Sequence, residues 1–354
     1  MTLIITCLAH EHIVQVADRR LTMPDGSLYD DDTNKAVYYC GRVAVAYTGL
    51  AIMEGKPTAE WIGSCMKDKA GTEQAMNHVA SHADAHFQNT NPRERRLAVV
   101  AVGWSTLQGA QPPRPFLCVA SNFLTDSWEW DTSAPRQMAV RTIFLRASSS
   151  HRIFVAGQRL TPEEKQRLDA LVACAIAGST PPTEWARFLG DAVRTVADGS
   201  DARATRVGKG LIIHLLSRKA AAEEHGMIVT PLNPDSHSFE YVSREGKIDP
   251  FQGAVIACDG SLLTDFKGGS IPPGGKGRIR TEMEESAQGH PIRVAVNESR
   301  FSSPCPFCVA EALTSGSRDG LHIVHGELPL NEVEAWVYCR GATGHLLLVQ
   351  RAAE

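Results

Sequence analysis

The sequence of 354 residues has no long apolar run, no excess of basic charge and no secretion signal. Its longest apolar stretches, such as Leu97 to Val102, are far shorter than the ~20 residues of a membrane-spanning helix. With 36 Lys and Arg against 40 Asp and Glu, the formal charge is −4, which provides no basic surface for nucleic acid or for an anionic membrane. We therefore expect no nucleic acid and no membrane among its partners.

The start of the chain has no positive charge before its apolar run and no cleavage site after it. The nine cysteines are odd in number and lie mostly in apolar runs, which is typical of reduced thiols rather than of a disulfide framework. These features predict a cytoplasmic protein without structural disulfides. Hydrophobic residues at 43% and charged residues at 21% are globular values, and the length suits two domains.

Strand and helix patterns follow one another in groups along the first 245 residues. A capping box with a first-turn proline, Thr161 to Glu164, marks the start of one helix. The expected hairpins are 2–8 with 13–17 and 35–40 with 42–47, the helices are 51–68, 72–88, 161–178 and 181–199, and the later strands are 97–104, 114–120, 127–130, 137–145, 152–155 and 210–216. This order predicts an α+β fold, a four-layer αββα sandwich in which helix pairs cover two stacked sheets.

The sequence changes character at about residue 246. A stretch rich in Gly and Pro, 267–275, is followed by short strand-like runs, of which 292–296 is the first. The later runs are 322–324, 335–338 and 346–349. We therefore predict a first domain over 1–245 and a smaller C-terminal α/β domain over 246–354, whose role the sequence does not indicate.

Thr2 directly follows the initiator methionine, and its small side chain is of the kind that methionine aminopeptidases accept. Removal of Met1 would leave a hydroxyl and an α-amine on the same residue. An α-amine has a reference pKa of about 7.7–8.0, so it can act as general base toward its own Oγ. Position alone is weak evidence, because any short motif is only a hypothesis.

Four further residues lie at the ends of the predicted hairpin strands. Asp18 and Arg20 end the second strand, Lys35 opens the third, and Gly49 follows the fourth. Together with Thr2 and the strand–helix order, they resemble the N-terminal nucleophile (Ntn) hydrolases of the proteasome β-subunit type, including the bacterial proteasome-like peptidases. The resemblance covers about residues 2–245 in layout and is specific over 2–50.

The resemblance implies a role for each matching residue. Thr2 is the nucleophile, Asp18 and Arg20 are the family's Asp and Arg, Lys35 is the catalytic Lys after one extra loop residue, and Gly49 is the oxyanion-hole glycine. A Lys35 ammonium beside Thr2 would lower the pKa of the hydroxyl and of the α-amine, and Asp18 would keep Lys35 charged. The backbone N–H of Gly49 would face the developing oxyanion.

Two departures from the family pattern concern the support of the α-amine. The family's Gly-Ser-Gly segment corresponds to Gly157-Gln158-Arg159, so Gln158 stands near the place of the supporting serine. Asp201 fits the aspartate of a later family segment, and Thr205, shifted by one, stands near the serine of that segment. We therefore take Gln158 and Asp201 as the supporting residues, and the orientation of the amine is the part of the site that the sequence leaves open.

A Cys-x2-Cys pair, Cys305 and Cys308, precedes an apolar helical run near the C-terminus. His322, His325 and Cys339 follow it, so the pair and two of these residues could make a tetrahedral zinc site. A redox dithiol at a helix N-terminus and plain packing are the other interpretations. A structural zinc in the C-terminal domain is the cofactor hypothesis, and catalysis itself requires no cofactor.

The leading functional hypothesis is a threonine-nucleophile amide hydrolase. We expect a proteasome-like peptidase that acts on a peptide or amide substrate and assembles as a homo-oligomer. One alternative is a catalytically silent Ntn-fold scaffold or assembly subunit, which the retention of Thr2, Asp18 and Lys35 argues against. Another is a nonpeptide amidase, which the sequence does not distinguish from a peptidase.

Overall fold

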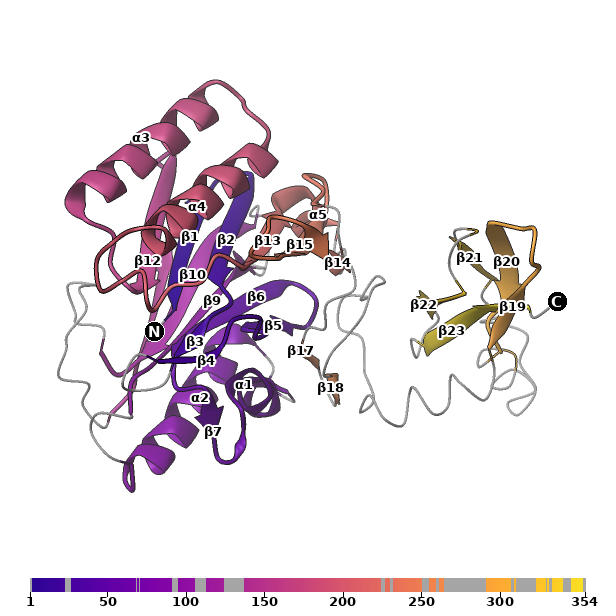
Figure 1. The fold of residues 1–354 in the computed structure, drawn as a ribbon, viewed down its shortest axis with the longest axis horizontal. Coiled ribbons are helices and arrows are strands. Elements are labelled where there is room, and N and C mark those ends of the chain that lie inside the picture. Colours follow the sequence, from indigo (N-terminus) through magenta and orange to yellow (C-terminus); the bar gives the residue numbers. More distant parts are fainter. Residues whose placement is uncertain are drawn as a thin grey trace.

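The computed structural model shows a mixed α/β protein with several sheets (Figure 1). It describes residues 2–22, 27–67, 69, 71–90, 95–105, 113–123, 137–223, 227–229, 232–249, 255–258, 261–263, 291–306, 309, 323–328, 330, 333–339 and 345–352. Over these residues the helices are α1 Thr58–Met66, α2 Thr72–Phe87, α3 Pro162–Ala177, α4 Pro182–Ala197 and α5 Arg218–Ala222. Among the described residues, none of the helices is long and apolar enough to cross a membrane.

Two seven-stranded sheets form most of the structure. The first has the order β12-β1-β2-β13-β15-β14, with β16 beside β15. Its strands are β1 Leu3–Ala9, β2 His12–Asp18, β12 His151–Gly157, β13 Leu211–Ser217, β14 Met227–Val229, β15 His237–Val242 and β16 Ile248–Asp249. The second has the order β11-β10-β9-β6-β5-β17-β18. Its strands are β5 Ala36–Tyr39, β6 Val43–Gly49, β9 Leu97–Ser105, β10 Arg114–Ser121, β11 Ala139–Phe144, β17 Val255–Cys258 and β18 Ser261–Leu263.

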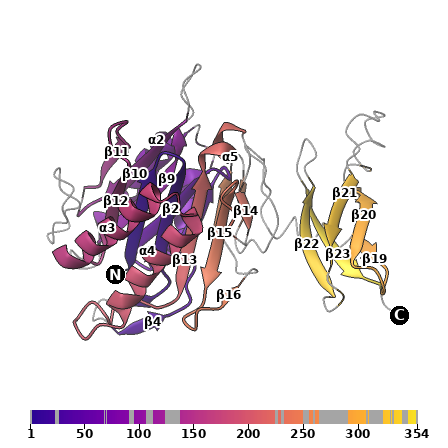
Figure 2. The same cartoon turned by 90° about the horizontal axis from the view of Figure 1, so that it is seen from above.

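Three apolar clusters connect the sheets and helices. One contains side chains of both sheets, including Ile4 and Leu8 from β1 and Ala44 and Ala46 from β6. A second joins the other face of the second sheet to α1 and α2, and a third joins the first sheet to α3 and α4. Figures 1 and 2 show these helix pairs on opposite sides of the sheets. Strand alternation sends neighbouring side chains into different clusters.

The remaining strands form small sheets. Near the N-terminus they are β3 Leu21–Thr22 with β4 Leu28–Asp30 and β7 Ile52–Met53 with β8 Lys56–Pro57. The C-terminal strands are β19 Ile292–Val294, β20 Arg300–Pro304, β21 Ile323–Glu327, β22 Glu334–Cys339 and β23 His345–Arg351. They have their own apolar cluster and are drawn apart from the large sheets in Figure 1. The domain boundary at 245/246 stays a prediction, although β16, β17 and β18 beyond it hydrogen-bond into the large sheets.

Most predicted elements match the structure to within a few residues. The capping box of α3 is confirmed, because Thr161 Oγ1 accepts from Glu164 N at 3.2 Å and Glu164 Oε2 accepts from Thr161 N at 2.7 Å. The helix predicted over 51–68 is wrong at its start, where β7 and β8 form a hairpin around Glu54 and Gly55, both with positive φ. Pro57 then precedes α1 in an extended conformation. The strand predicted over 127–130 lies outside the described residues.

Candidate active site

Thr2 lies just before β1, the strand between β12 and β2. Its carbonyl oxygen accepts from the backbone N–H of Gln158 at 3.0 Å and from Thr48 Oγ1 at 3.2 Å. Because side chains alternate along a strand, Thr2 faces the same way as Ile4, into the space between the two sheets. The residue is buried, with 2% of its surface exposed. The fold thus fixes the backbone and the side-chain direction of Thr2.

Lys35 connects the Thr2 hydroxyl to the end of β2. Its Nζ donates to Thr2 Oγ1 at 2.5 Å and to the backbone oxygen of Arg20, and it lies 3.4 Å from Asp18 Oδ1. An ammonium group has three N–H donors, so these three acceptors use all of them. Lys35 and Asp18 are both fully buried. The arrangement places one positive charge against the hydroxyl oxygen of Thr2.

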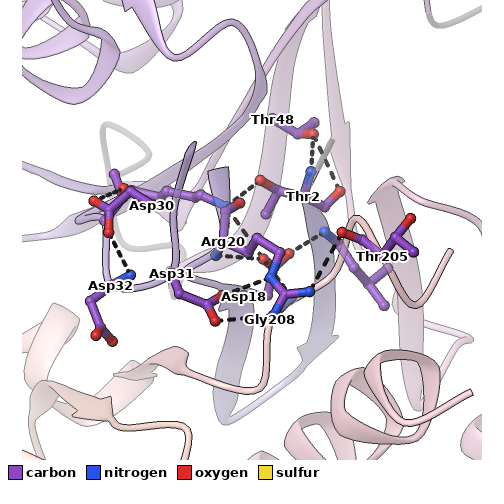
Figure 3. Close-up of polar contacts among 12 residues, drawn as sticks. Thr2, Asp18, Arg20, Asp30, Asp31, Asp32, Thr48, Thr205 and Gly208 are labelled. Carbon is purple, nitrogen blue, oxygen red and sulfur yellow. Dashed lines mark hydrogen bonds and ion pairs between the residues drawn. The ribbon is translucent and has the colours of Figure 1, made fainter. Parts of the chain in front are cut away.

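Asp18 is held by backbone N–H groups from three parts of the chain (Figure 3). Its Oδ2 accepts from Leu3 N at 2.6 Å. Its Oδ1 accepts from Arg20 N at 2.8 Å and from Gly208 N at 3.2 Å, and it also faces Lys35. An ionised carboxylate can only accept hydrogen bonds, which matches this set of donors. Asp18 therefore fixes the direction of the Lys35 side chain.

Burial lowers the pKa of Lys35 from 10.5 to about 8, although the negative charge of Asp18 acts in the opposite direction. The charged form is disfavoured because the side chain has lost its water, and the nearby carboxylate restores only part of that loss. Such a strongly shifted group beside a hydroxyl is typical of a functional site. Lys35 is thus charged at neutral pH and loses its proton in the mildly alkaline range.

Arg20 serves the site mainly through its backbone, which donates to Asp18 and accepts from Lys35. Its guanidinium binds Asp31 in a bidentate pair at 2.7 and 3.0 Å. The same guanidinium also lies within 3.4 Å of the carbonyl oxygen of Ala204. The pair raises the pKa of Arg20 and lowers that of Asp31. The side chain of Arg20 therefore connects Asp31 to the segment from Ala204 to Gly208.

Two glycines allow the chain segments around Thr2 to approach closely. Gly49 ends β6 with φ +120°, and a Cβ there would lie 1.9 Å from the carbonyl oxygen of Arg96. Gly157 ends β12 with φ +84°, and a Cβ there would lie 1.8 Å from the Thr2 carbonyl oxygen. Gly49 directly follows Thr48, which contacts Thr2, so it lies beside the nucleophile candidate. Its role as an oxyanion donor stays a prediction.

The two predicted supporting residues, Gln158 and Asp201, do not contact the Thr2 nitrogen through their side chains in the described structure, whereas Thr48 does. Gln158 contacts Thr2 only through its backbone N–H among the described contacts, and its buried Nε2 has no hydrogen-bond partner there. Asp201 is exposed and binds Arg203 at 2.6 Å, which in turn donates to Glu164. These contacts do not join Asp201 to the cluster around Lys35. The supporting roles of both residues stay predictions.

Sequence reasoning missed Thr48, whose hydroxyl contacts both the nitrogen and the carbonyl oxygen of Thr2. Alternation along β6 sends Ala44 and Ala46 into the space between the sheets, and Thr48 faces the same way. A polar residue in that alternating apolar series was the available signal. The pairing of the residue with Thr2 depends on how the two sheets stack, which the strand pattern does not contain.

The predicted zinc ligands are only partly described. Cys305 is buried in the apolar cluster of the C-terminal strands, and His325 is exposed on β21. Cys308, His322 and the side chain of Cys339 lie outside the described residues. Among the residues that the structure describes, no group of three or more His, Cys, Asp or Glu side chains could hold a metal ion. The zinc site stays a prediction.

The solved structures that are similar to part of this chain include two Anbu proteins and one HslV. Anbu (ancestral beta-subunit) from Yersinia bercovieri is 11% identical with a TM-score of 0.39, covering 61% of this chain and 81% of that chain. An Anbu (Gly-1) mutant from Hyphomicrobium sp. strain MC1 is 12% identical with a TM-score of 0.38, covering 61% and 83%. Eukaryotic HslV from Trypanosoma brucei is 10% identical with a TM-score of 0.34, covering 61% and 99%. The sequence matches no protein-family model and no curated protein. These TM-scores are too low to assign a function by similarity, so the chemistry of the site is argued from the residues of this chain alone.

Proposed function

We propose that this protein is a threonine-nucleophile amide hydrolase of the proteasome-like Ntn type, with Thr2 Oγ1 as nucleophile. The observation that carries the proposal is the 2.5 Å contact between Lys35 Nζ and Thr2 Oγ1 inside a buried site that also holds Asp18. In the full chain the Thr2 nitrogen is a peptide amide, which cannot accept a proton. Removal of Met1 converts it to an α-amine, which supplies the base.

The first half of the proposed reaction forms an ester on Thr2. Thr2 Oγ1 attacks the carbonyl carbon of the substrate amide while its proton moves to the α-amine, and the carbonyl electron pair moves to oxygen. The Gly49 N–H donates to this oxyanion, and the Lys35 ammonium stabilises the negative charge that develops on the attacking oxygen. The intermediate then collapses with cleavage of the C–N bond, and the leaving amine takes the proton from the α-ammonium.

The second half releases the acid product. A water molecule attacks the ester carbonyl while the α-amine takes one of its protons. Cleavage of the ester C–O bond returns the electron pair to Thr2 Oγ1, which regains a proton from the α-ammonium. The products are a carboxylic acid and an amine, and the site returns to its starting state without a cofactor.

The proposal includes the four-layer Ntn sandwich and a homo-oligomeric, cytoplasmic enzyme. The three apolar clusters between helices and sheets support the layering. In the C-terminal unit, Cys305 and Cys308 with two of His322, His325 and Cys339 remain the proposed ligands of a structural zinc. Elemental analysis of protein purified without chelator tests that site, because a structural zinc binds tightly enough to survive purification.

Two observations weigh against a silent scaffold and against a different nucleophile. A buried ion pair such as Lys35–Asp18 adds little stability, since removing two charges from water offsets their attraction. A silent scaffold would therefore have little reason to keep it. A cysteine nucleophile at Cys7 in β1 is a further alternative, but Cys7 is fully buried, and burial raises the pKa of its thiol to about 12. The thiol is therefore protonated and unreactive at neutral pH.

An acylating β-lactone probe tests the proposal. Attack by Thr2 Oγ1 on the lactone carbonyl opens the ring, so the chain gains the whole mass of the probe as an ester. Peptide mapping should locate the adduct on Thr2. Absence of an adduct would favour the silent scaffold, and an adduct on another residue would move the nucleophile. Cleavage of fluorogenic peptides against small nonpeptide amides then separates a peptidase from an amidase.

A further inference from the structure

We infer that the hydroxyl of Thr48 orients the α-amine of Thr2 and is a positioning residue for the general base. The inference rests on the proposed function and deepens it. Sequence reasoning placed the support of the amine at Gln158 and Asp201. The contacts around Thr2 favour Thr48, at the end of β6, for this role.

The geometry of Thr48 is specific for the main-chain atoms of Thr2. Thr2 N donates to Thr48 Oγ1 at 3.1 Å, and Thr48 Oγ1 donates to the Thr2 carbonyl oxygen at 3.2 Å (Figure 3). Thr48 is fully buried. A hydroxyl has one donor and two acceptor lone pairs, so a Thr48 hydroxyl that donates to the carbonyl presents only lone pairs to the nitrogen.

This division of donors determines what Thr48 does to the amine. One N–H of the α-amine points to Thr48 Oγ1, which restricts rotation about the N–Cα bond. The nitrogen lone pair is then directed away from Thr48 and is available to Thr2 Oγ1. Since a general base must be aimed at the proton it removes, this restriction raises the rate of proton transfer.

The expected alternatives are less suited to this task. The backbone N–H of Gln158 already serves the Thr2 carbonyl oxygen at 3.0 Å. The Gln158 side-chain amide nitrogen is buried and has no hydrogen-bond partner among the described residues. Asp201 is exposed and bound to Arg203. Of these three side chains, Thr48 is the one that contacts the Thr2 nitrogen in the described structure.

Gly157 makes room for this arrangement. A Cβ at that position would lie 2.8 Å from Thr48 Oγ1, in addition to its overlap with the Thr2 carbonyl. The β12 end, the β6 end and the start of β1 therefore meet closely only with glycine at 157. Thr48 can therefore reach the Thr2 main chain only because residue 157 has no side chain.

If Thr48 orients the amine, its loss should shift the pH–rate profile, which the loss of a merely structural residue would not do. An α-ammonium is a stronger donor to Thr48 than a neutral amine, so the hydroxyl favours the charged form and raises the pKa of the amine. Loss of the hydroxyl should therefore move the acid limb of the pH–rate profile to lower pH. The maximal rate should fall at the same time, because the amine is no longer oriented toward Thr2 Oγ1.

The test measures β-lactone acylation of Thr2 by intact mass, from pH 5.5 to 9, in wild type, Thr48→Val and Thr48→Ser; this range brackets the reference α-amine pKa of about 7.7–8.0. Val keeps the branched shape without the hydroxyl, and Ser keeps the hydroxyl alone. We expect the maximal rate of Thr48→Val to be at least about tenfold lower, which is part of the hundredfold or more that a general base contributes, and its acid limb to lie at lower pH. Thr48→Ser should retain the wild-type profile.

The outcomes separate the inference from the proposed function. If wild type is not acylated on Thr2, the proposed function fails and the inference fails with it. If wild type is acylated and Thr48→Val matches it in rate and profile, the inference alone is overturned. A rate loss in Thr48→Val without a shifted acid limb, or one that Thr48→Ser shares, also overturns it. Should Thr48→Val not fold by circular dichroism, Thr48→Ala carries the same expected results.

Discussion

Lys35 Nζ lies 2.5 Å from Thr2 Oγ1, and both residues are buried between the ends of the two central sheets. The contact joins the start of β1 to the start of β5, two strands that belong to different sheets. Asp18 completes the unit by accepting from Lys35 and from the backbone of Leu3, the residue after Thr2. A change at Lys35 or Asp18 should therefore alter the surroundings of the Thr2 hydroxyl, and it should also lower the free energy of unfolding because the remaining charge is left buried and unpaired.

Thr2→Ala should abolish acylation and hydrolysis while the protein still folds. The variant removes one acceptor from the buried Lys35 ammonium, so the free energy of unfolding should fall by about 1–3 kcal/mol. Thr2→Ser, which keeps the hydroxyl, and Cys7→Ser, which removes the buried thiol, are the matched controls and should keep activity. Undiminished turnover by Thr2→Ala would show that another group is the nucleophile.

Lys35→Ala and Lys35→Arg should each lose at least about a hundredfold in rate, the scale of a preorganised electrostatic group. Arg fails because a planar guanidinium does not replace a compact ammonium surrounded by three acceptors. Asp18 keeps its backbone donors in both variants, so the loop around it should stay in place. Steady-state kinetics measure the loss, and near-normal activity of Lys35→Ala would remove this residue from the mechanism.

The rate should also fall as the pH rises through about 8, where Lys35 loses its proton. The stability contribution of the same group has the opposite sign. Between pH 8 and 10.5 the unfolded chain binds more protons at Lys35 than the native state, so this contribution rises with pH. A decline in kcat/KM above pH 8 without a parallel loss of native circular dichroism is the expected result. A rate that stays flat to pH 10 would contradict the requirement for a charged Lys35.

Gly157→Ala should displace Thr2, because its Cβ would lie 1.8 Å from the Thr2 carbonyl oxygen. Gly55→Ala is a matched control, since Gly55 also has a positive φ but nothing within 4 Å of a Cβ. Both variants bear the left-handed backbone cost of about 1–2 kcal/mol. Denaturant unfolding should show a larger loss of stability in Gly157→Ala than in Gly55→Ala. Acylation by the β-lactone should be lost in Gly157→Ala and kept in Gly55→Ala. Equal behaviour of the two variants would contradict the close approach at Thr2.

The resemblance to the Ntn hydrolases identified those candidate site residues whose place depends on position along one strand. Asp18 at the end of β2 and Lys35 before β5 were assigned from the family resemblance. Lys35 contacts Thr2 Oγ1, and Asp18 contacts Lys35 and the backbone of Leu3. Their catalytic roles stay predictions. Thr48 was missed because its contact with Thr2 needs the stacking of two sheets. The backbone role of Arg20 was missed for a related reason, since a side-chain pattern does not show where a carbonyl points.

The fold shows the same division between local and long-range information. Strand and helix periodicity identified β1, β2 and the paired helices, because each has a regular apolar face. The helix predicted from residue 51 was wrong at its start, because the apolar residues before Thr58 lie in a short hairpin closed by Glu54 and Gly55. The strand β17 pairs with β5, which is far from it in sequence, and no local pattern indicates this pairing.

The buried His214 should make the protein acid-sensitive. Burial lowers its pKa from 6.5 to about 3, and its Nδ1 pairs with Gln15 Oε1 at 2.9 Å. As the pH falls below 6.5 the unfolded chain takes up a proton here and the native state does not, so stability is lost between pH 6.5 and 3. At pH 5 this loss should be about 2 kcal/mol.

Urea unfolding at pH 7 and pH 5 tests the role of His214. His214→Asn should lose stability at pH 7 through its altered packing and show a smaller further loss at pH 5 than wild type. His82→Asn, at an exposed position on α2, should keep the full acid sensitivity. If His214→Asn is as acid-sensitive as wild type, other groups cause the loss.

The proposed mechanism requires Thr2 to supply its own base, and the mass of the acylated chain shows whether it does so. Purified protein is treated with the β-lactone probe and analysed by intact mass and N-terminal sequencing. We expect that chains carrying the probe begin with Thr2, and that chains which retain Met1 stay unmodified in the same sample. Acylation of Thr2 in chains that retain Met1 would contradict the mechanism, because an amide nitrogen cannot accept the proton.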